Sequence, residues 1–122
     1  MSDEKVFDIP AAERARDEGM RHAIDHADSR ELNWSNRAYD LFVQYACLHG
    51  EFMTEDVREW AEQQGLPQPP DRRAWGAIAA IARRRGVVVH VRYAPQKSVN
   101  AHRAPKSVWR LREGYGAYKF DA

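Results

Sequence analysis

The sequence predicts a mainly helical α+β fold, with a three-helix core, a two- or three-stranded sheet after it and one additional helix before it. Two patterns support this prediction. Apolar residues recur at helical spacing in four separate stretches, and a run of alternating valines follows the last of them. The chain has 122 residues, of which 43% are hydrophobic, and this is enough for one domain with a buried core.

The first predicted helix covers residues 11–28. With the acidic lead-in Met1–Pro10 and the connection 29–33, it forms an acidic helical extension at 1–33. Its apolar face is narrow and rich in alanine, so we expect the helix to dock onto a larger body or to dimerise rather than to stand alone. This face consists of Ala12, Ala15, Gly19, Met20, Ala23, Ile24 and Ala27.

Capping residues and glycines bound the second and third predicted helices. Ser35 is expected to cap the second helix, which runs to about His49 before Gly50. Thr54 is expected to cap the third helix, which ends at Gly65 ahead of a proline-rich turn. Their inward-facing residues are predicted to be Ala38, Leu41, Phe42, Tyr45, Ala46 and Leu48 in the second helix and Val57, Trp60, Ala61 and Gln64 in the third.

Two short features lie in and after the second helix. The run Glu51–Met53 could add an edge strand to the sheet. The single cysteine, Cys47, lies among apolar residues and is interpreted as a small packed side chain. Because one cysteine cannot form an internal disulfide, a reducing cytoplasm is the expected location.

The central predicted helix is Asp71–Arg85, with Asp71 as its cap and Gly86 as its stop. We expect Trp75 in this helix and Trp109 in the sheet to be buried and to join the two elements. Helical spacing places Ala74, Trp75, Ile78, Ile81 and Ala82 on one side, and Arg73, Gly76, Ala77, Ala80, Arg83 and Arg84 on the other.

Two strands are predicted after this helix, Val87–Tyr93 and Ser107–Arg112, and the loop Ala94–Lys106 connects them. The tail at 113–122 is aromatic and has no predicted role. In the first strand, Val87, Val89, Val91 and Tyr93 alternate with Val88, His90 and Arg92. In the second, Trp109 and Leu111 are expected to face the core, and Val108, Arg110 and Arg112 the outside.

Charge is distributed unevenly along the chain. From Arg72 to Arg112 there are eleven Lys or Arg and no Asp or Glu, whereas the first 71 residues carry seven basic and sixteen acidic side chains. The formal net charge of +1 therefore hides local balances of −9 and +11. A basic half of this kind indicates a surface that binds polyanions. A solvated basic surface, or one that pairs with the acidic half, would give the same composition.

The order of the predicted elements resembles the winged helix-turn-helix family. The similarity covers Trp34 to Arg112 and consists of a helix, a short strand, a helix, a proline-rich turn, a basic helix and two strands. Four strings also resemble small proteins of phages and prophages, namely Trp34-Ser35, Gly65–Pro70, Arg73–Gly76 and Pro105–Trp109.

In the winged-helix family, the helix before the wing enters the DNA major groove and the wing touches the DNA backbone or minor groove. The resemblance therefore implies a domain at 34–112 that binds double-stranded DNA in a regulatory or replication-linked role. The recognition helix would be Asp71–Arg85 and the wing Ala94–Lys106. The candidate DNA-binding residues are Arg72, Arg73, Arg83, Arg84, Arg92, Lys97, His102, Arg103, Lys106 and Arg110.

The middle of this helix limits the resemblance. Gly76, Ala77 and Ala80 carry no side chain that could hydrogen-bond a base edge. They could let the backbone approach phosphates closely, or they could pack against a partner helix. The main alternative function is therefore a protein-interaction module, for example an inhibitor of a host or phage protein, and a homodimer is also left open.

Enzymatic and membrane functions have little support in the sequence. His22, Asp25, His26 and Asp28 could share a metal ion, but a solvated helix face is the favoured interpretation. The basic half has no carboxylates for metal-assisted catalysis, and the chain has no glycine-rich phosphate loop. We therefore expect no catalytic residue, metal or cofactor. No apolar run is long enough to cross a membrane, and the acidic start lacks a signal-peptide pattern.

Overall fold

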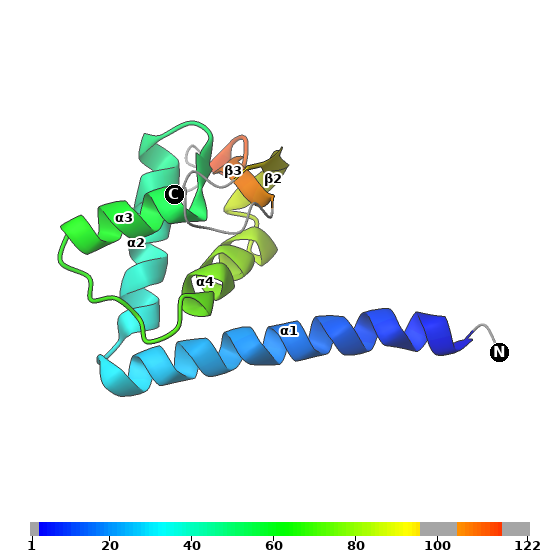
Figure 1. The fold of residues 1–122 in the computed structure, drawn as a ribbon. Helices are drawn as coiled ribbons and strands as arrows, with labels where there is room; N and C mark the ends of the chain where they lie inside the picture. The colour runs from blue at the N-terminus through cyan, green and yellow to red at the C-terminus, as the bar shows by residue number, and fades with distance from the viewer. Residues whose placement is uncertain (1–2, 96–104, 116–122) are drawn as a thin grey trace.

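The computed structural model describes residues 3–95 and 105–115, with side chains from Glu13 onward. The described residues form four helices and a three-stranded antiparallel sheet (Figure 1). The predicted mainly helical α+β class is thus confirmed. The elements are α1 (Asp3–Arg30), α2 (Trp34–Leu48), β1 (Phe52–Met53), α3 (Thr54–Gln63), α4 (Arg73–Arg84), β2 (Val88–Ala94) and β3 (Lys106–Leu111).

The sheet has the strand order β1-β3-β2, so β3 lies in the middle. The predicted edge strand is confirmed, because Phe52 in β1 pairs with Trp109 in β3. Between β2 and β3, His90 also pairs with Trp109, and a register shift follows between His90 and Arg92. This irregularity inserts Val91 as an extra residue into β2, so the simple alternation predicted for this strand does not hold beyond His90.

Helix α1 begins at Asp3, so the prediction of a lead-in at Met1–Pro10 is wrong. With 28 residues, α1 is about 42 Å long. Its carboxyl-terminal half packs against α4 and α2, and its amino-terminal half extends past the other elements (Figure 1).

A carboxylate on α1 caps α2. The N-cap residue of α2 is Asn33, with a left-handed φ of 63° and no capping bond from its own side chain. Ser35, predicted as the cap, lies inside the first turn. Its backbone N–H donates to Asp28 Oδ1 at 2.8 Å, and its hydroxyl donates to Asp28 Oδ2 at 2.7 Å. The cap prediction was therefore wrong, since the acceptor comes from the preceding helix.

The start of α3 also differs from the prediction. Thr54 is the first helical residue rather than the cap, and Met53 is the N-cap. The Met53 N–H donates to Asp56 Oδ2 at 2.8 Å, which satisfies one of the amides at the helix start. The Thr54 hydroxyl oxygen instead accepts a hydrogen bond from Trp109 Nε1 at 3.1 Å and so ties α3 to the sheet.

Helices α3 and α4 end in the same way, at the two glycines predicted to stop them. Gly65 has a φ of 96° and Gly86 a φ of 77°, values that favour glycine because other residues meet a steric penalty there. The following amides reach back into the last turn, from Leu66 to the Ala61 carbonyl at 3.1 Å and from Val87 to the Ala82 carbonyl at 2.9 Å. This is the Schellman arrangement of a helix end.

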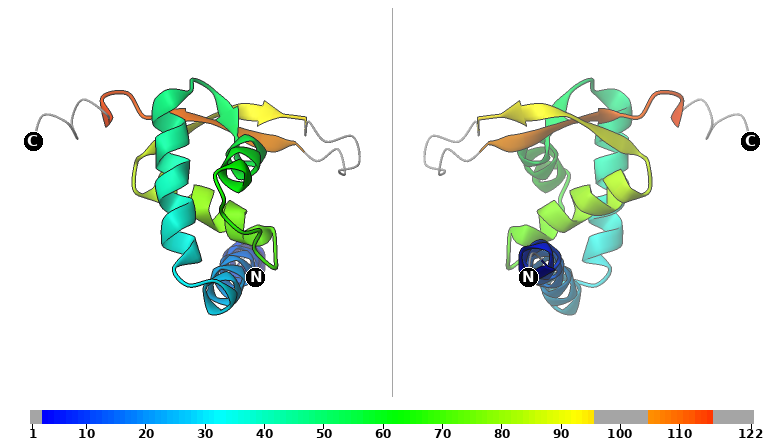
Figure 2. Two further views of the ribbon diagram at one scale, coloured as in Figure 1. Left: turned by 90° about the vertical axis from the view of Figure 1, so that its left-hand side faces the viewer. Right: turned by 90° about the vertical axis from the view of Figure 1, so that its right-hand side faces the viewer.

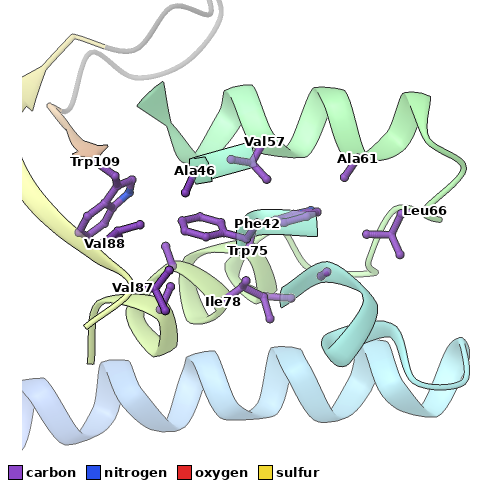
Figure 3. Packing of buried hydrophobic residues seen from close by; sticks show 14 of the residues in the cluster. Phe42, Ala46, Val57, Ala61, Leu66, Trp75, Ile78, Val87, Val88 and Trp109 are labelled. Carbon is purple, nitrogen blue, oxygen red and sulfur yellow. The ribbon is translucent and has the colours of Figure 1, made fainter. Parts of the chain in front are cut away.

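The core lies between α2, α3, α4 and one face of the sheet, and α1 adds Ala23 and Ala27 (Figure 3). Trp75 and Trp109 are 2% and 7% exposed, so both are buried as predicted. Trp75 packs edge-to-face on Trp34 with the ring centroids 5.4 Å apart. The largest fully buried side chains are Trp34, Phe42, Ile78, Val57, Val87 and Val88.

Several side chains lie on a different side from the one predicted. Cys47, Leu48 and Gln64 are exposed, Leu48 to 72%. Leu48 and Gln64 lie at the ends of their helices, where helical spacing continues but no element covers the side chain. Val108, predicted to face outward, is buried at 4% exposure.

Candidate functional site

The described lysines and arginines of the run from Arg72 to Arg112, which contains no Asp or Glu, lie on the surface. All nine of those that the structure describes are exposed, and we call these nine residues the basic surface. It contains seven of the ten predicted DNA-binding residues; the other three, Lys97, His102 and Arg103, lie outside the described residues. The basic surface consists of Arg72, Arg73, Arg83, Arg84, Arg85, Arg92, Lys106, Arg110 and Arg112.

At the start of α4, Arg73 is held by Asp71. The Asp71 carboxylate accepts hydrogen bonds from the Arg73 backbone N–H at 2.9 Å and from its guanidinium at 2.9 and 2.7 Å. The Arg73 hydrogen bonds lower the pKa of Asp71, and Asp71 in turn raises the pKa of Arg73. The prediction that Asp71 caps α4 is wrong, because the N-cap is Arg72 and the helix begins at Arg73. The Arg72 guanidinium has no hydrogen bond or ion pair to another described residue and is free to meet a ligand.

At the other end of α4, two of three consecutive arginines lie over aromatic rings. Arg83 Cζ is 6.0 Å from the Trp109 ring centroid, and Arg85 Cζ is 4.9 Å from that of Tyr39. Cation–π contacts of this kind orient a guanidinium without neutralising its charge. The guanidinium of Arg84, between them, has no polar partner among residues 3–95 and 105–115. All three keep their positive charge available to a ligand.

The sheet carries the remaining cations. The register places Arg110 opposite Val89 and Lys106 opposite Ala94, on the face of the sheet away from the Trp109 ring. Arg92 forms an ion pair with Glu51, and Arg112 donates to the Gly86 carbonyl. Only Arg92 and Arg73 of the basic surface are therefore paired with a described carboxylate.

The middle of α4 is covered by α1. This corrects the expectation that Gly76, Ala77 and Ala80 form an open face, and it decides between the two roles considered for them. None of the residues from 74 to 82 is exposed, and Ala77 is only 5% exposed. Figures 1 and 2 show α1 on the side of α4 away from the sheet. The small residues of α4 therefore pack a partner helix, and that helix belongs to the same chain.

Glycines on both helices permit this close packing. A Cβ on Gly19 of α1 would lie 3.1 Å from Arg73 Nη1, and one on Gly76 would lie 3.6 Å from Met20 Cε. The guanidinium of Arg73 thus passes over the backbone of α1 while it binds Asp71. Arg73, one of the candidate DNA-binding residues, is therefore constrained on both sides.

Other candidate sites offer little for catalysis. A cleft of about 270 Å³ lies between α1, α2 and the proline-rich turn, but its charged side chains are only Arg30 and Glu31. Glu31 also forms an ion pair with Arg37, with Arg37 Nη1 3.7 Å from Glu31 Oε1. Among the described residues, no group of three or more His, Cys, Asp or Glu is arranged to hold a metal ion. His22, Asp25 and His26 are exposed on α1, while Asp28 is engaged by Ser35.

The sequence reasoning left out Arg85, Arg112 and Tyr93 as candidate site residues. The two arginines belong to the same acid-free run, so charge alone could have included them. Tyr93 is 68% exposed, which only the sheet register reveals.

No described helix has the length and apolar character needed to span a membrane. Comparison of the chain with protein-family models, curated proteins and solved structures finds no match in any of the three.

Proposed function

We propose that this protein binds nucleic acid through phosphate contacts made by the basic surface. The observation that carries the proposal is the exposure of all nine described cations of the run, with only Arg73 and Arg92 ion-paired. Phosphate contacts from Lys and Arg supply most sequence-independent affinity for nucleic acids.

The arrangement of elements supports the same proposal. The order α2, β1, α3, α4, β2, β3 and the sheet order β1-β3-β2 are compatible with a winged helix-turn-helix layout. In that layout α4 would be the recognition helix and the β2–β3 hairpin the base of the wing. Helix α1 is then an addition that packs on α4.

The covered face of α4 determines how nucleic acid would be held. With no exposed residue between 74 and 82, the middle of the helix offers no side chain to base edges in a major groove. The contacts therefore fall on cations at the two helix ends and on the sheet. We expect binding that depends strongly on salt and only weakly on sequence.

The test is a salt series of affinities for random-sequence DNA, as duplex and as single strand. If about five or six cations neutralise phosphates, the logarithm of affinity for the duplex should fall with log salt at a slope of about −4 to −5. Arg84→Ala and Lys106→Ala should each weaken binding and make the slope shallower by about one unit.

The matched control is Arg37→Ala, which removes an exposed arginine from α2 that pairs with Glu31. This variant should bind like the wild type. Equal losses in Arg37→Ala and Arg84→Ala would mean that net charge, rather than the basic surface, determines affinity. If neither DNA form binds at low salt, the proposal is wrong.

A protein-interaction module is the second candidate, and one observation favours it. The amino-terminal half of α1 extends past the other elements (Figure 1), and every side chain from Glu13 to Glu18 is exposed. A helix that projects in this way offers a surface to a partner protein. A protein partner would remain bound at moderate salt, where phosphate contacts are lost.

A further inference from the structure

Tyr93 is an aromatic residue whose side chain is exposed to solvent. Three large hydrophobic side chains are exposed in the described part of the chain, Leu32, Leu48 and Tyr93, and Tyr93 is the aromatic one. It lies on β2 beside Arg92, near the end of the described hairpin. An aromatic ring that is 68% exposed gains little from the core and offers a flat apolar face to a ligand.

A row of rings connects Tyr93 to the core. Cross-strand pairing places Tyr93 opposite Ser107 and His90 opposite Trp109, and these four residues share one face of the hairpin. The His90 ring lies 4.5 Å from that of Tyr93 and 5.8 Å from that of Trp109, measured between centroids. The extra residue Val91 in β2 brings His90 and Tyr93 onto the same face.

The inner end of this row is fixed. Trp109 is 7% exposed, and its Nε1–H donates to Thr54 Oγ1 at 3.1 Å. His90 is half-buried, and its Nε2 has no hydrogen-bond partner among the described atoms. Both rings therefore serve as packing surfaces here. Tyr93 is supported on its inner side by His90 and is largely open on the other.

Two cations lie next to Tyr93 along the hairpin but project from its opposite face. Arg92 precedes Tyr93, and Lys106 pairs with Ala94, which follows it. Arg92 is ion-paired with Glu51, whereas the exposed Lys106 ammonium has no polar partner in the described part of the chain. A strand that passes around the edge of the hairpin can offer a base face to Tyr93 and a phosphate to Lys106.

From this arrangement we infer that the site takes single-stranded nucleic acid, with an unpaired base stacked on Tyr93 and a neighbouring phosphate on Lys106 across the edge of the hairpin. The inference rests on the proposed function and names its ligand. The faces of bases in a duplex are already stacked on neighbouring base pairs, so an exposed ring reaches them only where a strand is unpaired. The covered middle of α4 points the same way, because it removes the helix that would otherwise read a duplex groove.

The experiment measures the affinity of the whole chain for labelled oligothymidylate of about 20 nucleotides and for a blunt duplex of the same length. Wild type, Tyr93→Ala and Tyr93→Phe are compared by fluorescence anisotropy at low salt. Tyr93→Ala should weaken single-strand binding by about fivefold to 150-fold and leave duplex binding within about twofold. Tyr93→Phe keeps the ring and should retain most of the affinity.

Leu48→Ala is the matched control, because it removes another exposed apolar side chain, from the end of α2. A second readout uses oligothymidylate with one 5-iodouridine, which crosslinks to a stacked aromatic side chain under ultraviolet light. Peptide mapping should locate the crosslink at Tyr93. An altered fold would not produce this result, and the melting temperature of each variant is measured alongside.

The outcomes separate this inference from the proposed function. Preference for the single strand that is lost in Tyr93→Ala supports both. Preference for the duplex, or equal losses on both DNA forms in Tyr93→Ala, overturns the inference and leaves phosphate binding intact. Absence of binding to either form overturns both.

Discussion

Met20 of α1 lies over Gly76 of α4. A Cβ atom added to Gly76 would lie 3.6 Å from the terminal methyl carbon of Met20. This contact lies where α1 covers the outward side of the central helix. It explains why the run of small residues in α4 is a packing surface, since a large residue at this position would separate the two helices. The relationship between these two residues can be tested directly.

Gly76→Ala should stabilise the protein. The added methyl meets Met20 at an ordinary van der Waals distance, and alanine is favoured over glycine inside a helix by about 0.5–1 kcal/mol. Gly76→Leu should instead destabilise by about 1–3 kcal/mol, because its branched end needs the space that Met20 occupies. Urea unfolding of both variants measures the difference. A leucine variant as stable as the alanine one would show that α1 is not held at this contact.

Trp75→Ala should lower the free energy of unfolding by about 3–5 kcal/mol, as expected when a buried aromatic side chain is removed. Trp75 is 2% exposed and packs edge-to-face on Trp34. Leu32→Ala is the control, since Leu32 is 87% exposed and its loss should change stability by less than about 0.5 kcal/mol. Chemical denaturation provides the measurement, and similar values for the two variants would contradict the described core.

Asp28→Ala should destabilise the protein by about 1 kcal/mol, although Asp28 belongs to a different helix from the one it caps. It removes the acceptor for both the N–H and the hydroxyl of Ser35. Ser35→Ala removes only the hydroxyl bond and should cost less. In a double-mutant cycle, the two substitutions should be non-additive. Full additivity would mean that the Asp28–Ser35 contact does not contribute.

Asp71→Ala should destabilise the protein at neutral pH and have less effect in acid. Hydrogen bonds from Arg73 lower the pKa of the Asp71 carboxyl in the folded protein below its ordinary value of 3.8. The stabilisation is therefore complete above that value and is lost as the pH falls through the lowered pKa. Melting temperatures of wild type and variant across this range should converge at the acid end. A constant difference would assign the effect to packing rather than to the carboxylate.

The same substitution should raise affinity for nucleic acid if the proposed function is correct. Asp71→Ala removes a negative charge beside the basic surface and releases the Arg73 guanidinium from its ion pair. The gain should be largest at low salt, where exposed charges are least screened. The affinities of wild type, Asp71→Ala and the Arg37→Ala control for DNA should be measured at low salt. If Asp71→Ala binds no more tightly than wild type, Arg73 lies outside the binding surface.

Local sequence patterns predicted the fold class and the approximate position of every described helix and strand, apart from the first eight residues of α1. These patterns are local, because each involves residues that are close together in the chain. They include the helical spacing of apolar residues, the glycines at 65 and 86 and the valine run, and each predicts its element without knowledge of the tertiary contacts. The burial of Trp75 and Trp109 followed from the same local patterns. The charge of the basic surface was also evident, because long charged side chains are rarely buried without a partner.

Contacts between distant elements determine what covers each face, and these contacts could not be predicted from the sequence. The pattern in α4 left open whether Gly76, Ala77 and Ala80 meet a phosphate or another helix, and the answer depends on where α1 lies. The capping of α2 by Asp28 could not be predicted for the same reason, because the carboxylate that binds Ser35 comes from another helix. The exposure of Tyr93 likewise depends on the register between β2 and β3. Periodicity shows that a face is apolar or small, but contacts between elements far apart in the chain determine which partner covers it.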